Sequence, residues 1–326
     1  MQTAGSRYSG LIPDLVAKAF PQACILECSQ LTGGLVNSNF KLRLDSPKLT
    51  LVLRIYQRDP AACAREIGLL QLLRGTVPVP DVFYAEPLGT ATDRPFALLS
   101  YIDGITFQQL KRSGDIAGIQ KSAYDVGKIL ATIGRYKFAD VGTLETGFAV
   151  TETFIKGADP VPRFLDRCLT SNILQKRVTV PIQDRLHDLI WSWAPRFEGI
   201  EQEQSLVHCD FGSRNILVNA RLEKPNDWEV VGIIDWEFAF FGSPLFDIGH
   251  FLRYERDNQP LREPYFSRGF IDGGGTLPDD WRQLARMIDL TALVDLLTRP
   301  DLPTEIVAEV LELLQATITW IRGTMR

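Results

Sequence analysis

The most informative stretch of this chain runs from LVHCDFGSRNILVN at residues 206–219 to VVGIIDWE at residues 230–237. Its apolar and polar pattern predicts a strand, a polar turn, a second short strand, a reversal and a third apolar strand that ends in acids. Asp210, Asn215 and Asp235 stand where these strands end. Because strand ends are rigid and the loops beyond them commonly carry chemistry, these three residues are the first candidates for a functional site.

The three polar residues suit phosphoryl transfer. That reaction needs an aligned hydroxyl group, a carboxylate near its proton and metal ions that clamp the phosphates. Asp210, at the start of a polar turn, is predicted to be the hydroxyl-orienting base. Asn215 and Asp235 offer a neutral and an anionic oxygen, which are the ligands that Mg2+ prefers. Taken singly, such residues in a turn are commonly caps of local backbone groups, so the prediction depends on the whole pattern.

The first hundred residues predict a small sheet with one packed helix. A short leading helix is expected at residues 11–20. The expected strands cover residues 24–31, 40–44, 51–56, 81–86 and 95–102. A further helix is expected to begin at Asp59, the N-cap before Pro60, and to end at Gly75.

The segment GGLVNSN at residues 33–39 lies between the first two expected strands. Gly33 and Gly34 let backbone N–H groups approach an anion closely, which is one way to hold a phosphate. A plain hairpin turn explains the same glycines, so the motif alone leaves both interpretations open.

Arg54 lies in the third expected strand, on the face opposite Leu53 and Ile55. Glu66 lies beside the apolar stripe of the helix that begins at Asp59. Because a carboxylate on the buried side of a helix needs a cation, Arg54 is its predicted partner. Such a pair would direct the guanidinium toward nucleotide phosphates.

The rest of the chain predicts a mainly helical part. The expected helices cover residues 117–136, 183–193, 281–297 and 302–321. Residues 137–182 are not assigned to elements. Residues 254–280 are expected to form a connector around the three glycines at 273–275.

The chain is long enough for two lobes. At 326 residues it exceeds the usual size of a single domain. Asp103-Gly104 is the predicted hinge, which divides the chain into a nucleotide-binding lobe at residues 1–102 and a mainly helical lobe at residues 103–326. The second lobe would carry the polar turn with Asp210.

Composition excludes several classes of function. The chain is 45% hydrophobic and 23% charged, as in ordinary soluble proteins, and its net charge of -5 argues against nucleic acid as a partner. Five cysteines without C-x-x-C spacing indicate reduced thiols and a cytoplasmic location. The first residues lack an apolar signal core, and no long uncharged apolar run follows, so neither secretion nor a membrane partner is expected.

Four motifs lie in the second half of the chain: HCDFGSRN at residues 208–215, IDWE at 234–237, GSP at 242–244 and Asp247. Together they resemble the aminoglycoside phosphotransferase family, a branch of the protein-kinase-like fold that also includes choline, homoserine and methylthioribose kinases. The first motif is similar to the loop of hygromycin phosphotransferases. The resemblance implies an α+β, protein-kinase-like two-lobe fold, with a five-stranded antiparallel sheet and a helix in the N-terminal lobe and a mainly helical C-terminal lobe.

The resemblance also implies a nucleotide site in the first lobe. The glycine segment would be the phosphate loop, with Gly33, Gly34 and Asn37 binding the nucleotide. Arg54 stands where the family usually has its ATP-binding lysine, and Glu66 matches the family's helix glutamate. 

Three further assignments follow from the same resemblance. The carbonyl of Ser100 and the N–H of Ile102 would pair with the adenine. His208 would brace the catalytic loop by hydrogen bonding, and Asp247 would hold that loop by accepting backbone N–H bonds.

Two residues depart from the family pattern. Cys209 stands where the family usually has glycine, and a larger side chain is expected there only if the backbone does not need a positive φ. Arg54 keeps the charge of the usual lysine but changes its geometry. Zinc at His208-Cys209-Asp210 is not expected, because neighbours on a strand point to opposite faces.

The sequence therefore predicts an Mg2+-dependent kinase that transfers the γ-phosphate of ATP or GTP to a hydroxyl of a small molecule. An aminoglycoside-like acceptor would make it an antibiotic-resistance enzyme. Four acids, Glu237, Glu255, Asp257 and Glu263, are predicted to bind ammonium groups of such an acceptor, although each is also explained as a solvated charge. The nucleotide and the acceptor are the expected partners of a monomer or homodimer.

Three alternatives remain. A metabolite kinase of the choline, homoserine or sugar type fits the same motifs. A nucleotide-binding module with weak catalysis is suggested by the departures at Arg54 and Cys209. Protein-kinase activity is disfavoured, because only twelve positions separate Asp235 from Asp247 and leave little room for an activation segment.

Overall fold

The protein is described by a computed structural model that covers residues 8, 10–31, 37–90, 93–138, 142–144, 150–152, 159–221, 224–255 and 259–324. Its chain forms two compact units. The first unit comprises Met1–Ser122, Leu144–Ala149 and Ser213–Phe238, and the second comprises Ala123–Thr143, Val150–Gly212 and Ala239–Arg326. The lobe boundary between residues 102 and 103 stays a prediction.

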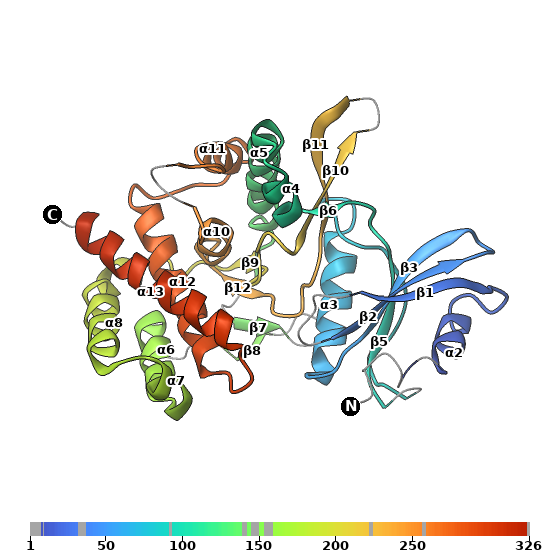
Figure 1. The fold of residues 1–326 in the computed structure, drawn as a ribbon, viewed down its shortest axis with the longest axis horizontal. Helices are drawn as coiled ribbons and strands as arrows, with labels where there is room; N and C mark the ends of the chain where they lie inside the picture. The colour runs from blue at the N-terminus through green and yellow to red at the C-terminus, as the bar shows by residue number, and fades with distance from the viewer. Residues whose placement is uncertain are drawn as a thin grey trace. The chain divides into compact units, whose positions relative to one another are not determined.

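A five-stranded sheet forms the centre of the first unit, in the order β1-β2-β3-β5-β4 (Figure 1). Its strands are β1 (Ile25–Leu31), β2 (Ser38–Leu44), β3 (Leu49–Ile55), β4 (Val82–Glu86) and β5 (Phe96–Ser100). Neighbouring strands pair antiparallel throughout. The expected five-stranded antiparallel sheet is therefore confirmed.

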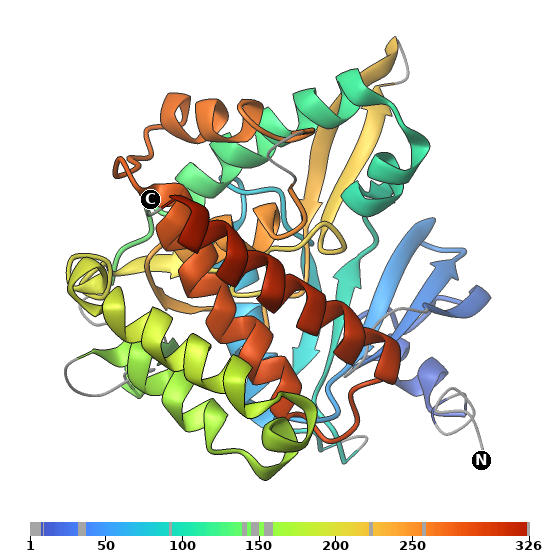
Figure 2. The ribbon, with the colours of Figure 1, turned by 60° about the vertical axis from the view of Figure 1, so that its left-hand side comes forward.

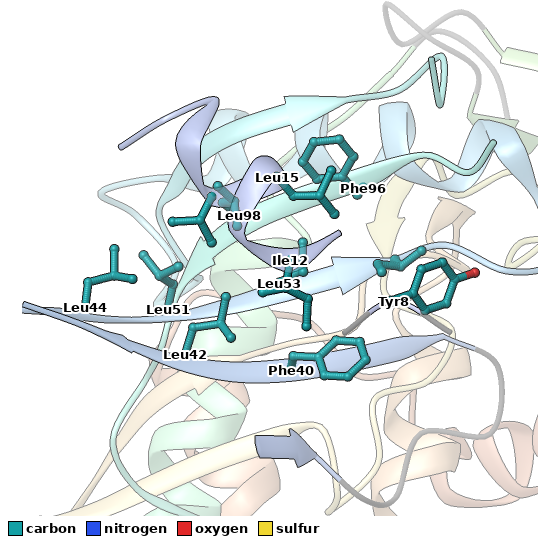
Figure 3. Packing of buried hydrophobic residues seen from close by; sticks show 12 residues of the cluster. Tyr8, Ile12, Leu15, Phe40, Leu42, Leu44, Leu51, Leu53, Phe96 and Leu98 are labelled. Atoms are coloured by element: carbon teal, nitrogen blue, oxygen red, sulfur yellow. The ribbon is translucent and has the colours of Figure 1, made fainter. Parts of the chain in front are cut away.

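One face of this sheet carries a hydrophobic cluster (Figure 3). Leu51, Leu53 and Ile55 of β3 are fully buried there against the short helix α2 (Ile12–Ala17). Because side chains alternate along a strand, Arg54 points to the opposite face. The two faces of one strand thus separate the apolar core from a polar cluster.

Helix α3 (Pro60–Leu73) covers that opposite face. The Asp59 carboxylate caps it by accepting a hydrogen bond of 2.9 Å from the N–H of Ala61. Gly75 follows the helix with φ of 81°, a conformation that glycine adopts without strain. Both predicted ends of this helix are confirmed.

A second sheet of the first unit has the order β11-β10-β6. Strands β10 (Ile216–Arg221) and β11 (Lys224–Ile233) form the expected strand and reversal, and they stand side by side in Figure 1. Strand β6 (Ile105–Thr106) has only two residues, which is too short for a sequence pattern. It leads into helix α4 (Phe107–Ser113), whose capping box joins Thr106 and Gln109.

The second unit is mainly helical. Helix α5 begins in the first unit and continues into the second. The helices are α5 (Ile116–Ile133), α6 (Pro160–Leu169), α7 (Asn172–Arg177), α8 (Val180–Ser192), α9 (Ala194–Phe197), α10 (Leu245–Leu252), α11 (Tyr265–Asp272), α12 (Trp281–Thr298) and α13 (Thr304–Thr324). Helix α12 is the central one, since it packs against α6, α7, α10 and α13, and Figure 2 shows α13 lying along it.

Short strands complete the second unit. They are β7 (Gly142–Leu144), β8 (Val150–Glu152), β9 (Ser205–Val207) and β12 (Phe240–Gly242), in the sheet order β8-β7-β12-β9. The unassigned residues 137–182 contain β7, β8, α6 and α7. The expected connector at 254–280 contains helix α11, which ends at Asp272 with Gly273 as its C-cap.

Close packing fixes helix α10 against helix α12. A Cβ atom at Gly249 would lie 2.3 Å from the carbonyl oxygen of Ala285, so only glycine allows this approach. The approach matters for the site, because α10 carries Asp247 and His250. Among the residues described, no helix is long and apolar enough to cross a membrane.

Candidate active site

The first unit contains a charged cluster, here called the Arg54 cluster: the buried residues Arg54, Glu66 and Glu237, and Asp235, whose side chain is partly exposed. Nε of Arg54 lies 3.0 Å from Oε2 of Glu66, which confirms the predicted ion pair. Nη2 of Arg54 pairs with Oδ1 of Asp235 and lies 3.7 Å from Oε1 of Glu237. One guanidinium therefore joins β3, α3 and the end of the IIDWE motif.

The local fold explains why these groups meet. Asp235 follows β11 with φ of 72°, a left-handed conformation that aspartate tolerates better than most residues. The turn buries Trp236, whose backbone N–H donates to Oε1 of Glu66 at 3.2 Å. The N–H of Ile234 donates to the carbonyl of Asn215 at 3.0 Å, so the two predicted metal ligands flank the neighbouring ends of the paired strands β10 and β11.

The Arg54 cluster contains more acidic than basic side chains. Its three carboxylates outnumber its one guanidinium, and Glu66 is only 2% exposed. Burial raises the pKa of Glu66 and of Glu237, whereas Arg54 opposes this rise. Tyr56 donates its hydroxyl to Oε2 of Glu66 at 2.6 Å, which satisfies the buried carboxylate further.

Glu237 connects this cluster to Asn37, in the second half of the predicted phosphate loop. Its Oε2 accepts a hydrogen bond of 2.9 Å from Nδ2 of Asn37. The Asn37 side chain in turn accepts from the N–H of Gln57 at 3.1 Å, and Arg65 donates to the Glu237 carbonyl at 3.1 Å. Asn37 is thus tied to the cluster, while Gly33 and Gly34 lie outside the described residues.

In the second unit, backbone hydrogen bonds to a buried carboxylate hold the HCDFG segment, residues 208–212. Asp247, fully buried on α10, accepts a hydrogen bond of 2.8 Å from the N–H of His208 and one of 2.9 Å from the N–H of Cys209. Burial raises the pKa of Asp247 to about 7, and the two N–H donors oppose that rise. The expected bonding of Asp247 to the loop backbone is confirmed.

His208 contacts the same loop. The ring is fully buried, and its Nδ1 accepts a hydrogen bond of 3.3 Å from the N–H of Asp210. This contact fits the bracing role expected of His208, and that role stays a prediction.

Cys209 adopts a conformation that the sequence did not favour. Its φ is 70°, so the expectation that a cysteine here avoids a positive φ is wrong. The bonds from Asp247 to two successive N–H groups hold this backbone in place despite the side chain. Burial also raises the pKa of the Cys209 thiol strongly, which keeps the thiol protonated.

Asp210, the residue after Cys209, has an accessible carboxylate. Its side chain is 39% exposed, and its Oδ1 lies 3.4 Å from Nε2 of His250 on α10. Sequence reasoning assigned no role to His250. The available signal was its spacing from Asp247, because residues three apart share one helix face.

Three of the four acids proposed to bind an acceptor have internal partners, and those of Glu237 are Asn37 and Arg54. Glu255 accepts from the backbone N–H and from Nε of Arg262, both at 2.6 Å. Glu263 pairs with Arg282 at 2.9 Å. Asp257 lies outside the described residues. The substrate role of all four acids stays a prediction.

The two predicted adenine contacts lie at the end of β5: Ser100 is its last residue, and Ile102 follows two positions later. Ser100 donates its N–H to the carbonyl of Asp81 at 2.8 Å. The side chain of Ile102 packs closely against Gly232, since a Cβ atom added at that glycine would lie 2.7 Å from Cδ1 of Ile102. Their pairing with a base stays a prediction.

Comparison with known proteins decides the family. The sequence model described as "Phosphotransferase enzyme family" matches residues 27–287. The chain belongs to this phosphotransferase family. The resemblance stated from the sequence is therefore confirmed.

Solved structures share the fold of this phosphotransferase. A thermostable mutant of aminoglycoside phosphotransferase APH(4)-Ia, in complex with AMP-PNP and hygromycin B, superposes with a TM-score of 0.67 at 16% identity, over 94% of this chain and 97% of that one. The streptomycin–ATP complex of APH(2")-IIa gives 0.61 at 18% identity, over 94% and 96%. A putative aminoglycoside phosphotransferase from Ralstonia eutropha gives 0.65 at 16%, over 97% and 98%.

Curated relatives are longer proteins. Mouse (Mus musculus) acyl-CoA dehydrogenase family member 10 is 23% identical over 283 residues, which are 78% of this chain and 24% of the relative. Acyl-CoA dehydrogenase family member 11 of Pongo abelii is 23% identical over 176 residues, or 54% and 20%. The chain thus spans about a quarter or less of the curated relatives it matches.

Proposed function

We propose that this phosphotransferase transfers the γ-phosphate of ATP or GTP to a hydroxyl group of a small molecule. The observation that carries the proposal is the HCDFG segment, where a buried carboxylate fixes two successive N–H groups and leaves Asp210 accessible. A carboxylate held in this way suits a base that orients a hydroxyl and accepts its proton.

The Arg54 cluster supports the nucleotide half of the proposal. Arg54 offers a guanidinium to phosphate oxygens, and Glu66 holds its orientation. Asn215 and Asp235 would bind Mg2+, because both offer oxygen ligands and a phosphate-bound Mg2+ needs only one or two from the protein. When bound, Mg2+ neutralises charge on the transferred phosphate.

The structural neighbours suggest an aminoglycoside-like acceptor, since two were solved with hygromycin B and with streptomycin. A metabolite acceptor is the second candidate. It is favoured by the ion pairs of Glu255 with Arg262 and of Glu263 with Arg282, because paired acids are less available to ammonium groups.

The test is an assay of ADP and GDP release over a panel of aminoglycosides, amino alcohols and sugars, with 31P NMR of the products. Asp210→Asn is expected to lower kcat by about a thousandfold, since it removes the base. Asp166→Asn is the matched control, because Asp166 of the same unit bonds only peripheral His187 and Trp191 in the contacts described. Wild-type turnover by Asp210→Asn would contradict the role of Asp210.

A second arm separates a kinase from a nucleotide-binding module. Mg2+-dependent nucleotide binding without phosphate transfer to any acceptor would favour the module. Turnover that disappears with EDTA and returns with Mg2+ would favour the kinase.

A further inference from the structure

His250 lies on the same face of α10 as Asp247, one turn further along the helix. Asp247 bonds the N–H groups of residues 208 and 209, and His250 faces the carboxylate of residue 210. One helix face therefore acts on three successive residues of the loop.

The imidazole of His250 is neutral at ordinary pH. Burial, together with a smaller contribution from the nearby Arg253, lowers its pKa to about 3. His208 acts in the same direction, whereas Asp289 and the Cys209 backbone oppose the shift. A neutral ring carries a single N–H, so its position must be assigned.

The surroundings of the two ring nitrogens assign that hydrogen. Nε2 lies 3.4 Å from Oδ1 of Asp210. Nδ1 is buried and has no hydrogen-bond partner among the described residues. Were the hydrogen on Nδ1, a buried donor would be unsatisfied and two acceptors would face each other across 3.4 Å. The Nε2–H tautomer avoids both costs.

The loop has room for this contact because residue 212 is glycine. A Cβ atom at Gly212 would lie 3.1 Å from Nε2 of His250, closer than most side-chain contacts. The distance of 3.4 Å to Asp210 is long for a hydrogen bond, as is common for catalytic groups before a substrate tightens them.

We propose that His250 is a positioning residue for phosphoryl transfer: its neutral imidazole donates Nε2–H to Oδ1 of Asp210 and so orients the carboxylate that accepts the proton of the acceptor hydroxyl. This inference rests on the proposed function for its catalytic consequence. Its structural content, the tautomer and the donor, stands apart from any activity.

The first experiment measures the tautomer directly, on the wild-type chain with 15N-labelled histidine. The chain has three histidines, so His187→Gln and His250→Gln variants assign every imidazole signal. His250 is expected as the neutral Nε2–H form between about pH 5 and pH 8. A charged ring or the Nδ1–H form in that range would overturn the proposal, even if no acceptor is ever found.

The second experiment compares substitutions that place an amide N–H differently. Gln can present its amide where His presents Nε2, whereas Asn matches Nδ1 and Leu has no donor. His250→Gln is expected to lose at most about threefold in kcat, and His250→Asn and His250→Leu about tenfold, with the nucleotide KM unchanged. In the Leu variant, the acid limb of the kcat/KM profile is expected to rise by about 1 pH unit, because ionised Asp210 loses a donor.

These outcomes separate positioning from a merely structural role. Rates are expressed per folded molecule, from circular dichroism of each variant. Equal losses in the Gln and Leu variants, or wild-type kcat and pH profile in the Leu variant, would overturn the proposal. Absence of turnover in the wild type would instead contradict the proposed function, and the NMR result would still decide the role of His250.

Discussion

The Arg54 cluster of the first unit and the HCDFG segment of the second fix their carboxylates by different means. In the cluster, one guanidinium holds three acids by charge. In the segment, Asp247 is held by backbone N–H groups, and Asp210 faces a neutral imidazole. The first arrangement depends on the balance of charge, whereas the second depends on satisfying donors whose positions the backbone fixes.

The largest expected effect removes the only cation of the Arg54 cluster. Arg54→Met leaves the buried Glu66 and Glu237 and the partly exposed Asp235 without their guanidinium. We expect the free energy of unfolding to fall by about 3–5 kcal/mol, as for other broken buried ion pairs, in urea denaturation. Arg54→Lys is the control, because it keeps the charge and loses only the forked geometry. A Met variant as stable as wild type would show that charge balance does not hold the cluster.

The corresponding change in the second unit is Asp247→Ala. It leaves the N–H groups of His208 and Cys209 without their acceptor, and we expect a loss of about 2–4 kcal/mol together with a reduced kcat. Asp166→Ala, which removes only side-chain contacts, is expected to cost less. Thermal unfolding measures the stability of the two variants, and turnover assays measure their kcat. Equal losses of stability in the two variants would contradict a greater cost of leaving the backbone N–H donors unsatisfied.

The pH dependence of stability tests the pair on α10. Folding lowers the pKa of His250 from 6.5 to about 3, so the folded state binds fewer protons than the unfolded state and stability falls as pH falls through this window. Folding raises the pKa of Asp247 from 3.8 to about 7, so its contribution to stability falls as pH rises. Between these limits the two dependences cancel.

His250→Gln removes one half of this cancellation. Relative to wild type, the variant is expected to lose stability by about 1.4 kcal/mol per pH unit as pH rises from about 4 to 6.5. Urea denaturation at several pH values measures the difference. His187→Gln, at an exposed position on α8, is the control. A constant difference across the window would contradict the opposed shifts.

The smallest expected effect concerns Glu237. If it acts by holding Asn37, Glu237→Gln keeps an acceptor for that amide and should change stability by less than about 1 kcal/mol. Glu237→Ala would raise the nucleotide KM. If Glu237 instead binds an ammonium group of the acceptor, both variants would raise the acceptor KM, and kinetic constants for the two substrates distinguish these cases.

Local patterns in the sequence were sufficient for much of the fold. The caps at Asp59 and Gly75 and the alternation of β2 and β3 predicted elements that the structure contains. Strands β6 and β12 were missed, because two or three residues give no period. Residues 137–182 were unassigned for a related reason: their described elements include three-residue strands and a six-residue helix.

The sequence by itself determined the family and the candidate residues for its chemistry, because the motifs around Asp210 and Asp235 are contiguous in the chain. The sequence also predicted the pair of Arg54 with Glu66, but only the tertiary structure decided the other partners of the charged residues. Asn37 and Glu237 are 200 positions apart, and Arg54 and Asp235 are 181 apart. Such contacts depend on how strands and helices pack, and no local pattern carries that information. The role inferred for His250 has the same origin, since it arises from the packing of α10 against the loop.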